Sequence, residues 1–115
     1  MPDTLMDRAA GLGERGATTA DSGLSYLPGE PVTVLVRKRG IRYDLGDEGR
    51  AIGLAGRPPG WRAAAARVVT ESALNLARDG RVYVLAVAGR DLDALAARVA
   101  ETSANVYDAV LDLEG

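Results

Sequence analysis

The amino-acid sequence predicts an α+β fold in which an antiparallel sheet carries helices on one face. Two observations support this prediction. Apolar and polar residues alternate with a period of two between residues 32 and 45, which is typical of strands. Between residues 61 and 79, and again between 92 and 113, apolar residues recur with the period of a helix. The order of these segments gives an α+β layout.

The first 31 residues are expected to form an N-terminal arm, because five glycines interrupt any long periodic pattern there. Residues 3–10 can form one or two helical turns, but so short a helix is marginal unless it docks on the rest of the chain. Leu24, Tyr26 and Leu27 are the residues expected to anchor the arm or to begin a strand. Residues 32–115 are expected to form a single α+β domain.

This domain is expected to begin with a three-stranded antiparallel meander. Its first strand is predicted at residues 32–36 and its second at 41–45, joined by the turn Arg39-Gly40 into a hairpin. A glycine-rich turn then leads to a short third strand, Ala51–Leu54. Pro58 and Pro59 end the sheet because proline removes a hydrogen-bond donor.

Two helices and a further strand complete the prediction. One helix is expected from Trp61 to Asp79, with Gly80 as its C-terminal stop. The apolar run 82–88 predicts a strand that is covered on both faces or central in the sheet. Asp91 is well placed to cap a long closing helix from Leu92 to Leu113.

Composition excludes several classes of chemistry. The 115-residue chain contains no Cys and no His, so it has no disulfide, no thiolate nucleophile, no Cys-ligated metal and no imidazole base. Catalysis is left to carboxylates, Tyr, Ser, Arg, the lone Lys38 or a cation held by oxygen ligands. These absences favour a non-enzymatic protein without a cofactor.

Hydropathy indicates no association with a membrane. No run of about 20 apolar residues is present to span a bilayer. The first seven residues also lack the basic and then apolar layout of a signal peptide. We therefore expect a cytoplasmic protein.

Basic residues cluster at the tip of the first predicted hairpin, and two aromatic residues follow. Such a hairpin can grip phosphates while aromatic rings stack on bases. The net charge of −2 argues against nucleic acid as the partner, and charged hairpin tips commonly protect sheet edges. The candidate binding residues, for a protein or a nucleic-acid partner, are Arg37, Lys38, Arg39, Arg42, Tyr43 and Trp61.

Three carboxylates form an alternative site. Asp44 or Asp47 together with Glu71 could hold a hard cation for phosphodiester hydrolysis. The competing interpretation is a solvated hairpin turn in which Asp47 accepts a hydrogen bond from its own backbone. We favour the turn, because nothing in the sequence fixes a second carboxylate nearby, and expect no metal.

The closing helix carries an apolar seam that can bury against the sheet or against a second copy of the chain. Homodimerisation through this helix, or through an edge strand of the meander, is therefore a hypothesis. The seam consists of Leu92, Val99, Val106, Val110 and Leu113.

Charge is distributed unevenly along the chain. Residues 37–67 hold eight basic and three acidic side chains, whereas residues 91–115 hold one basic and six acidic side chains. This asymmetry favours the pairing of opposite surfaces over binding to a uniformly charged polymer.

The stretch from Arg42 to Leu113, with its turn Asp47-Glu48-Gly49, resembles small bacterial and phage α+β domains of unknown function. Its order of elements is also similar to that of dimeric secretion chaperones. That resemblance implies a module that holds a partner polypeptide without doing chemistry. The chaperones have a pair of strands between their main helices, whereas only one is clear here, and no functional residues carry over.

Together these observations predict a homodimeric, non-enzymatic interaction, adaptor or chaperone-like module for a protein or peptide. The alternative is a metal-dependent nuclease-like enzyme or nucleic-acid binder that uses the basic hairpin and the nearby carboxylates.

Overall fold

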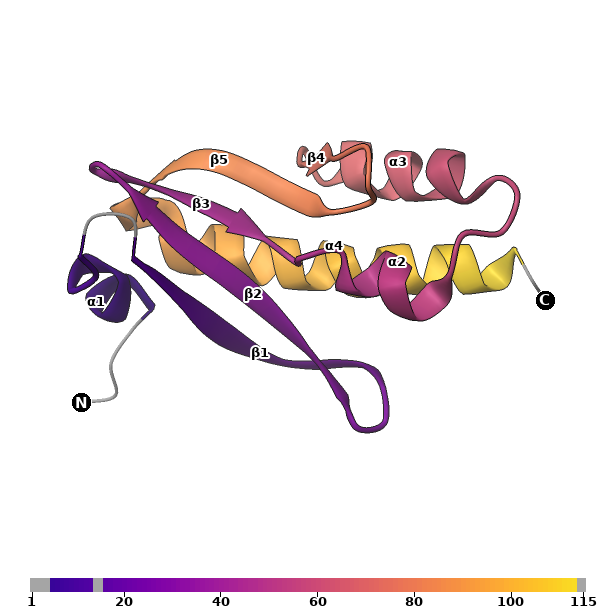
Figure 1. The fold of residues 1–115 in the computed structure, drawn as a ribbon, viewed down its shortest axis with the longest axis horizontal. Coiled ribbons are helices and arrows are strands. Elements are labelled where there is room, and N and C mark those ends of the chain that lie inside the picture. The colour runs from indigo at the N-terminus through magenta and orange to yellow at the C-terminus, as the bar shows by residue number, and fades with distance from the viewer. Residues whose placement is uncertain (1–4, 14–15, 114–115) are drawn as a thin grey trace.

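A computed structural model describes residues 5–13 and 16–113 of the chain. Within these residues, five antiparallel strands form one sheet in the order β1-β2-β3-β5-β4. Figure 1 shows the long helix α4 running along one side of the sheet. The predicted α+β class, with a meander, a further strand and a long closing helix, is confirmed. The elements are α1 (Leu5–Ala10), β1 (Ala17–Leu27), β2 (Glu30–Arg39), β3 (Arg42–Gly46), α2 (Arg50–Ala55), α3 (Trp61–Glu71), β4 (Asn75–Leu76), β5 (Val82–Ala88), the 3-10 turn η1 (Gly89–Asp91) and α4 (Leu92–Asp112).

The hairpin of β2 and β3 follows the predicted alternation. Val32, Val34 and Val36 are almost fully buried, whereas the residues between them face the opposite side of the sheet. Arg39 pairs with Arg42 across a two-residue turn, in which Gly40 has a φ of 64°. This positive φ is the backbone conformation that glycine adopts without strain.

The third strand of the meander is not the predicted one. Ala51–Leu54 was expected to be a strand, and this prediction is wrong because the segment lies in α2. Ala51, Ile52 and Ala55 are buried on one side of that short helix. A run of four apolar residues has no period that distinguishes a strand from a buried helical turn. The third strand is instead β1, which lies within the expected arm and pairs with β2.

The helix expected from Trp61 to Asp79 ends early, at Glu71. Ala73 takes a left-handed conformation with a φ of 59°, and the amide of Leu74 donates to the carbonyl of Val69. These features are typical of a helix C-terminus. The next residues form β4, which pairs with β5, so two strands separate α3 from α4 and not one. Gly80 therefore lies in the β4–β5 turn and is not a helix stop.

Helix α4 buries the apolar seam inside the chain. Leu92, Val99, Val106 and Val110 have no solvent exposure, whereas Leu113 is 46% exposed. The seam thus serves as the side of α4 that packs against the rest of the same chain. A dimer built on these four buried residues would require the core to open.

The short helix α1 docks at the start of β1 and of α4, as Figure 1 shows. Leu5 and Ala9 are buried, and the amide of Leu5 donates to Oδ1 of Asp93 at 3.1 Å. Lys38 holds the other end, because its Nζ donates to the carbonyl oxygens of Ala10 and Leu12 at 3.4 and 3.2 Å. Tertiary contacts therefore stabilise a helix too short to form alone.

Membrane crossing has no support in the described part of the chain. Within residues 5–13 and 16–113, no helix combines the length and the apolar composition that a bilayer requires.

Gly80 provides a direct test of how the β4–β5 turn packs. Its φ is 98°, and a Cβ at this position would lie 2.9 Å from Cγ1 of Ile52. We expect Gly80→Ala to lower the free energy of unfolding by about 3 kcal/mol, because it adds backbone strain and a core clash. Urea denaturation measures this loss.

Gly53→Ala is the matched control, since Gly53 lies in α2, has no positive φ and has open space around its Cα. It should leave stability unchanged or raise it by up to about 1 kcal/mol. A Gly80→Ala protein as stable as the wild type would contradict the close packing on Ile52.

Candidate functional site

The four basic residues of the predicted hairpin do not form one patch. Arg37, Arg39 and Arg42 lie on the open face of the sheet, whereas Lys38 alternates to the other side and holds α1. Arg39 donates from Nε and Nη2 to the two carboxylate oxygens of Asp44, at 2.9 and 3.1 Å. These bonds lower the pKa of Asp44 and raise the pKa of Arg39. Two of the four basic side chains, Lys38 and Arg39, therefore form hydrogen bonds within the chain.

Neither predicted aromatic residue offers a free ring. Tyr43 is only 6% exposed and belongs to the core. Trp61 is half-buried, and the guanidinium carbons of Arg57 and Arg62 lie 5.6 and 4.6 Å from its ring centre. Both arginines also donate to carbonyl oxygens of the β4–β5 turn, those of Asp79 and Arg78. Trp61 thus anchors that turn on α3.

The three carboxylates proposed for a metal do not come together. Asp44 accepts from the amide of Ala86 at 3.0 Å, in addition to Arg39, and so stabilises an irregularity in β5 where Ala86 has a φ of 58°. Asp47 is buried, and Glu71 is exposed at the end of α3. Across residues 5–13 and 16–113, no group of three His, Cys, Asp or Glu side chains is arranged to hold a metal ion.

Asp47 is the centre of a buried set of hydrogen bonds, which we call the polar network. Its Oδ1 accepts from the amides of Gly49 at 2.8 Å and Val82 at 2.9 Å. Its Oδ2 accepts from Oγ of Ser103 at 2.6 Å, and that Oγ lies 2.7 Å from the hydroxyl of Tyr26. The bond to Gly49 confirms that Asp47 bonds to its own backbone. The predicted solvated hairpin turn is wrong, because α2 follows this turn and Asp47 is only 2% exposed.

The direction of each bond in the polar network follows from counting protons. The hydroxyl of Ser103 has one proton, which it donates to the carboxylate of Asp47. Tyr26 must therefore donate to Ser103. Burial raises the pKa of Tyr26. The ring of Tyr26 is tilted against the ring of Tyr107, and the two ring centroids are 5.6 Å apart. Every buried side-chain nitrogen and oxygen among the described residues has a hydrogen-bond partner.

The open face of the sheet carries a groove of about 390 Å³, which we call the open-face groove. Cross-strand pairing places Leu35 beside Gly46 and Gly46 beside Tyr83. Because Gly46 has no side chain, the surface is low between these two larger residues, and a Cβ there would lie 3.6 Å from Cβ of Tyr83. Leu85, 54% exposed, adds apolar surface. Four charged residues also line the groove: Arg37, Asp44, Glu48 and Arg81.

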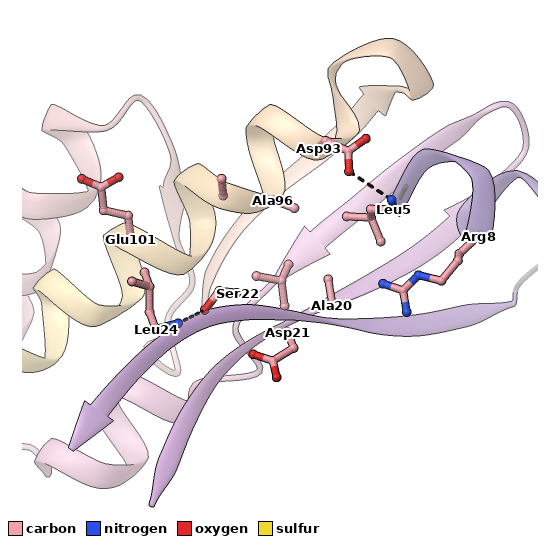
Figure 2. Close-up of a pocket in the computed structure, with 11 residues that line it drawn as sticks. Leu5, Arg8, Ala20, Asp21, Ser22, Leu24, Asp93, Ala96 and Glu101 are labelled. Atoms are coloured by element: carbon pink, nitrogen blue, oxygen red, sulfur yellow. Dashed lines mark hydrogen bonds between the residues drawn. The ribbon is translucent and has the colours of Figure 1, made fainter. Parts of the chain in front are cut away.

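A larger hollow of about 510 Å³ lies between β1, α1 and α4, and we call it the β1–α4 cleft. Figure 2 shows its apolar part, where Leu5, Ala20, Leu24 and Ala96 converge. Charged residues surround this part: Arg8, Asp21, Asp93 and Glu101. Three of these four are acidic, which favours a cationic group on whatever enters the cleft.

Sequence reasoning missed the partners of Asp47 and the role of Gly46. One signal was available for Ser103, because a polar residue on the buried stripe of a helix needs a hydrogen-bond partner. Nothing in the sequence pairs Ser103 with Tyr26, 77 positions away. Gly46 was assigned to a turn, and only the strand register shows it between Leu35 and Tyr83.

Comparison with protein-family models, curated proteins and solved structures finds no match for this chain. The functional argument therefore depends on the geometry described above.

The polar network predicts different effects for two substitutions of Asp47. Asp47→Ala removes the acceptor for two amides and one hydroxyl, so we expect the free energy of unfolding to fall by about 3 kcal/mol or more. Asp47→Asn keeps an oxygen for the amides and should cost no more than about 1 kcal/mol. Urea denaturation at neutral pH compares them, and equal losses would show that the bonds to the backbone amides contribute little.

The pKa of Asp47 predicts a pH dependence of stability. Burial raises this pKa above the ordinary value of 3.8, outweighing the hydrogen bonds from Ser103, Val82 and Gly49, which lower it. The folded state therefore binds the proton more tightly than the unfolded state, so stability decreases as the pH rises from 3.8 through the raised pKa.

Asp47→Asn has no such titration and serves as the control. The free energy of unfolding of the wild type, minus that of Asp47→Asn, should decrease from pH 4 to pH 7. Urea denaturation of both proteins at several pH values measures this difference. If the difference increases with pH, the hydrogen bonds outweigh burial and the pKa is lowered.

Proposed function

We propose that this protein is a non-enzymatic interaction module that forms homodimers and binds a protein or peptide partner in the open-face groove. The observation that carries the proposal is the apolar surface around Gly46 on the face of the sheet opposite α4, formed by the exposed Leu85 and the partly exposed Leu35 and Tyr83. Contiguous exposed apolar surface with a polar rim is typical of protein-binding sites.

The residue types in the groove support a protein partner. Tyr and Arg are enriched where proteins bind one another, and both Arg37 and Arg81 line the groove beside Tyr83. The neighbouring leucines provide the apolar centre of such a site. The strand pair β4 and β5 between α3 and α4 is also similar to the pair of strands that the secretion chaperones have between their main helices.

The charges around the groove favour a polypeptide over a nucleic acid. Asp44 is paired with Arg39, and Arg81 with Asp79 at 3.0 Å. Among the described residues, Arg37 and Glu48 have no ion-pair partner. One charge of each sign suits a partner with both acidic and basic groups, whereas a phosphate backbone would be repelled by Glu48.

No observation gives similar support to the alternative, a metal-dependent nuclease-like enzyme or nucleic-acid binder. That function needs neighbouring carboxylates or a continuous basic surface. Here Asp44 and Arg39 bond to each other, and Asp47 is buried in the polar network.

Site-specific photo-crosslinking tests the groove. A photoreactive amino acid replaces Leu85 in the full chain, and Leu54 in a control, because Leu54 is also exposed but lies on α2. In extract of the source organism, the probe at Leu85 should give a discrete protein adduct that mass spectrometry identifies, and the probe at Leu54 should not. Adducts that nuclease treatment removes would contradict the proposal.

The purified partner then allows a quantitative test. Leu85→Glu places a charge in the apolar centre of the groove and should weaken binding by about tenfold or more. Leu54→Glu should leave the affinity unchanged. Titration calorimetry measures both, and an unchanged affinity for Leu85→Glu would show that the partner binds elsewhere.

A further inference from the structure

Strand β1 is an edge of the sheet, and the direction of its backbone groups can be deduced. Gly16 lies opposite Lys38, and its carbonyl accepts from the amide of Lys38 at 2.8 Å. In an antiparallel pair, every second residue exchanges hydrogen bonds with its partner strand. Gly16, Thr18 and Ala20 therefore bond toward β2, and the residues between them direct their N–H and C=O groups away from the sheet.

The outward-directed residues are Ala17, Thr19 and Asp21, and they form a short regular edge. Beyond Asp21 the pairing becomes irregular: Gly23 has a φ of 78°, and Oγ of Ser22 donates to the carbonyl of Val32 in place of an amide. Oδ1 of Asp21 accepts from the amide of Gly23 and stabilises this bulge. With respect to residues 5–13 and 16–113, the edge available to another strand thus spans residues 17–21.

We infer that this edge pairs with the same edge of a second copy, in antiparallel orientation, about a two-fold axis that passes beside Thr19. The inference rests on the homodimer of the proposed function and assigns its surface. Thr19 would exchange both backbone bonds with the second copy's Thr19. Ala17 would do so with the second copy's Asp21, and Asp21 with its Ala17.

This register is self-complementary, as a two-fold interface requires. Each outward N–H meets an outward C=O, and the two threonines form a cross-strand pair of a favourable kind. The two Asp21 carboxylates lie at opposite ends of the paired segment, each opposite a small neutral residue. No like charges are therefore placed directly across the interface.

Charge on the open face supports the same register. Ala17 pairs with Arg37 of β2, so the two side chains lie on the same face of the sheet. The second copy's Asp21 would lie beside Ala17 on this face, with only the small Ala17 between its carboxylate and Arg37. Arg37 has no ion-pair partner among the described residues, and the same arrangement occurs twice by symmetry.

The burial of the α4 seam favours the edge of β1 as the surface for a second copy. Leu92, Val99, Val106 and Val110 pack inside their own chain, so these four residues offer no surface to a second copy. The edge needs no rearrangement of the core, and exposed edge backbone is a known template for pairing between chains.

Light scattering on the full chain after size exclusion tests the pairing. At tens of micromolar, the wild type should have twice the 12.0 kDa mass of one chain. Thr19→Pro removes an outward N–H without removing a bond to β2, so it should be monomeric with an unchanged circular dichroism spectrum. Thr19→Val keeps the N–H and should remain dimeric. Arg37→Glu should weaken the dimer by about tenfold, because it places a second negative charge near the second copy's Asp21.

Hydrogen exchange provides a readout that requires no variant. The amides of Ala17, Thr19 and Asp21 should exchange more slowly as the concentration of wild-type chain rises. A dimer in which these amides stay unprotected, or which Thr19→Pro does not disrupt, overturns the edge pairing but leaves the homodimer intact. A wild type that remains at 12.0 kDa overturns both, whereas binding in the open-face groove is tested separately through Leu85.

Discussion

One buried carboxylate connects four parts of the fold that lie far apart in the sequence. Asp47 bonds to the turn before α2 through Gly49, to β5 through Val82, and to α4 through Ser103, which in turn accepts from Tyr26 on β1. A carboxylate removed from water is tolerated only when hydrogen bonds replace its hydration. The positions of these four elements are therefore coupled, since moving any one of them would leave the group unsatisfied.

Other polar residues whose chemistry would suit a functional site are also hydrogen-bonded within the fold. Asp44 stabilises β5 through Ala86, and Arg57 and Arg62 tie the β4–β5 turn to α3 while flanking Trp61. With these groups committed to the fold, the surfaces proposed for binding are the open-face groove and the edge of β1. The groove lies on a face of the sheet, and the edge lies at one end of the strand order.

Elements with a clear period could be predicted from the sequence, and elements defined by contacts could not. Val32, Val34 and Val36 alternate, and β2 was predicted from them; the seven-residue recurrence from Leu92 likewise predicted α4. Strand β1 was missed because Gly23 and the bulge beside it break the alternation. Of the candidate site, the turn at Asp47 was foreseen, but its burial depends on Ser103 and Tyr26, which only the fold brings near. The hollow at Gly46 depends on strand register in the same way.

Strand β4 forms the other edge of the sheet and has only two residues. Two residues present too few backbone groups to hold an added strand, because each new strand must offset the entropy of ordering it. In the proposed pairing of two copies through β1, both ends of the combined sheet would be β4 strands. Sheet growth would then stop at two chains, which would protect such a dimer from open-ended polymerisation and from fibres of the cross-β type.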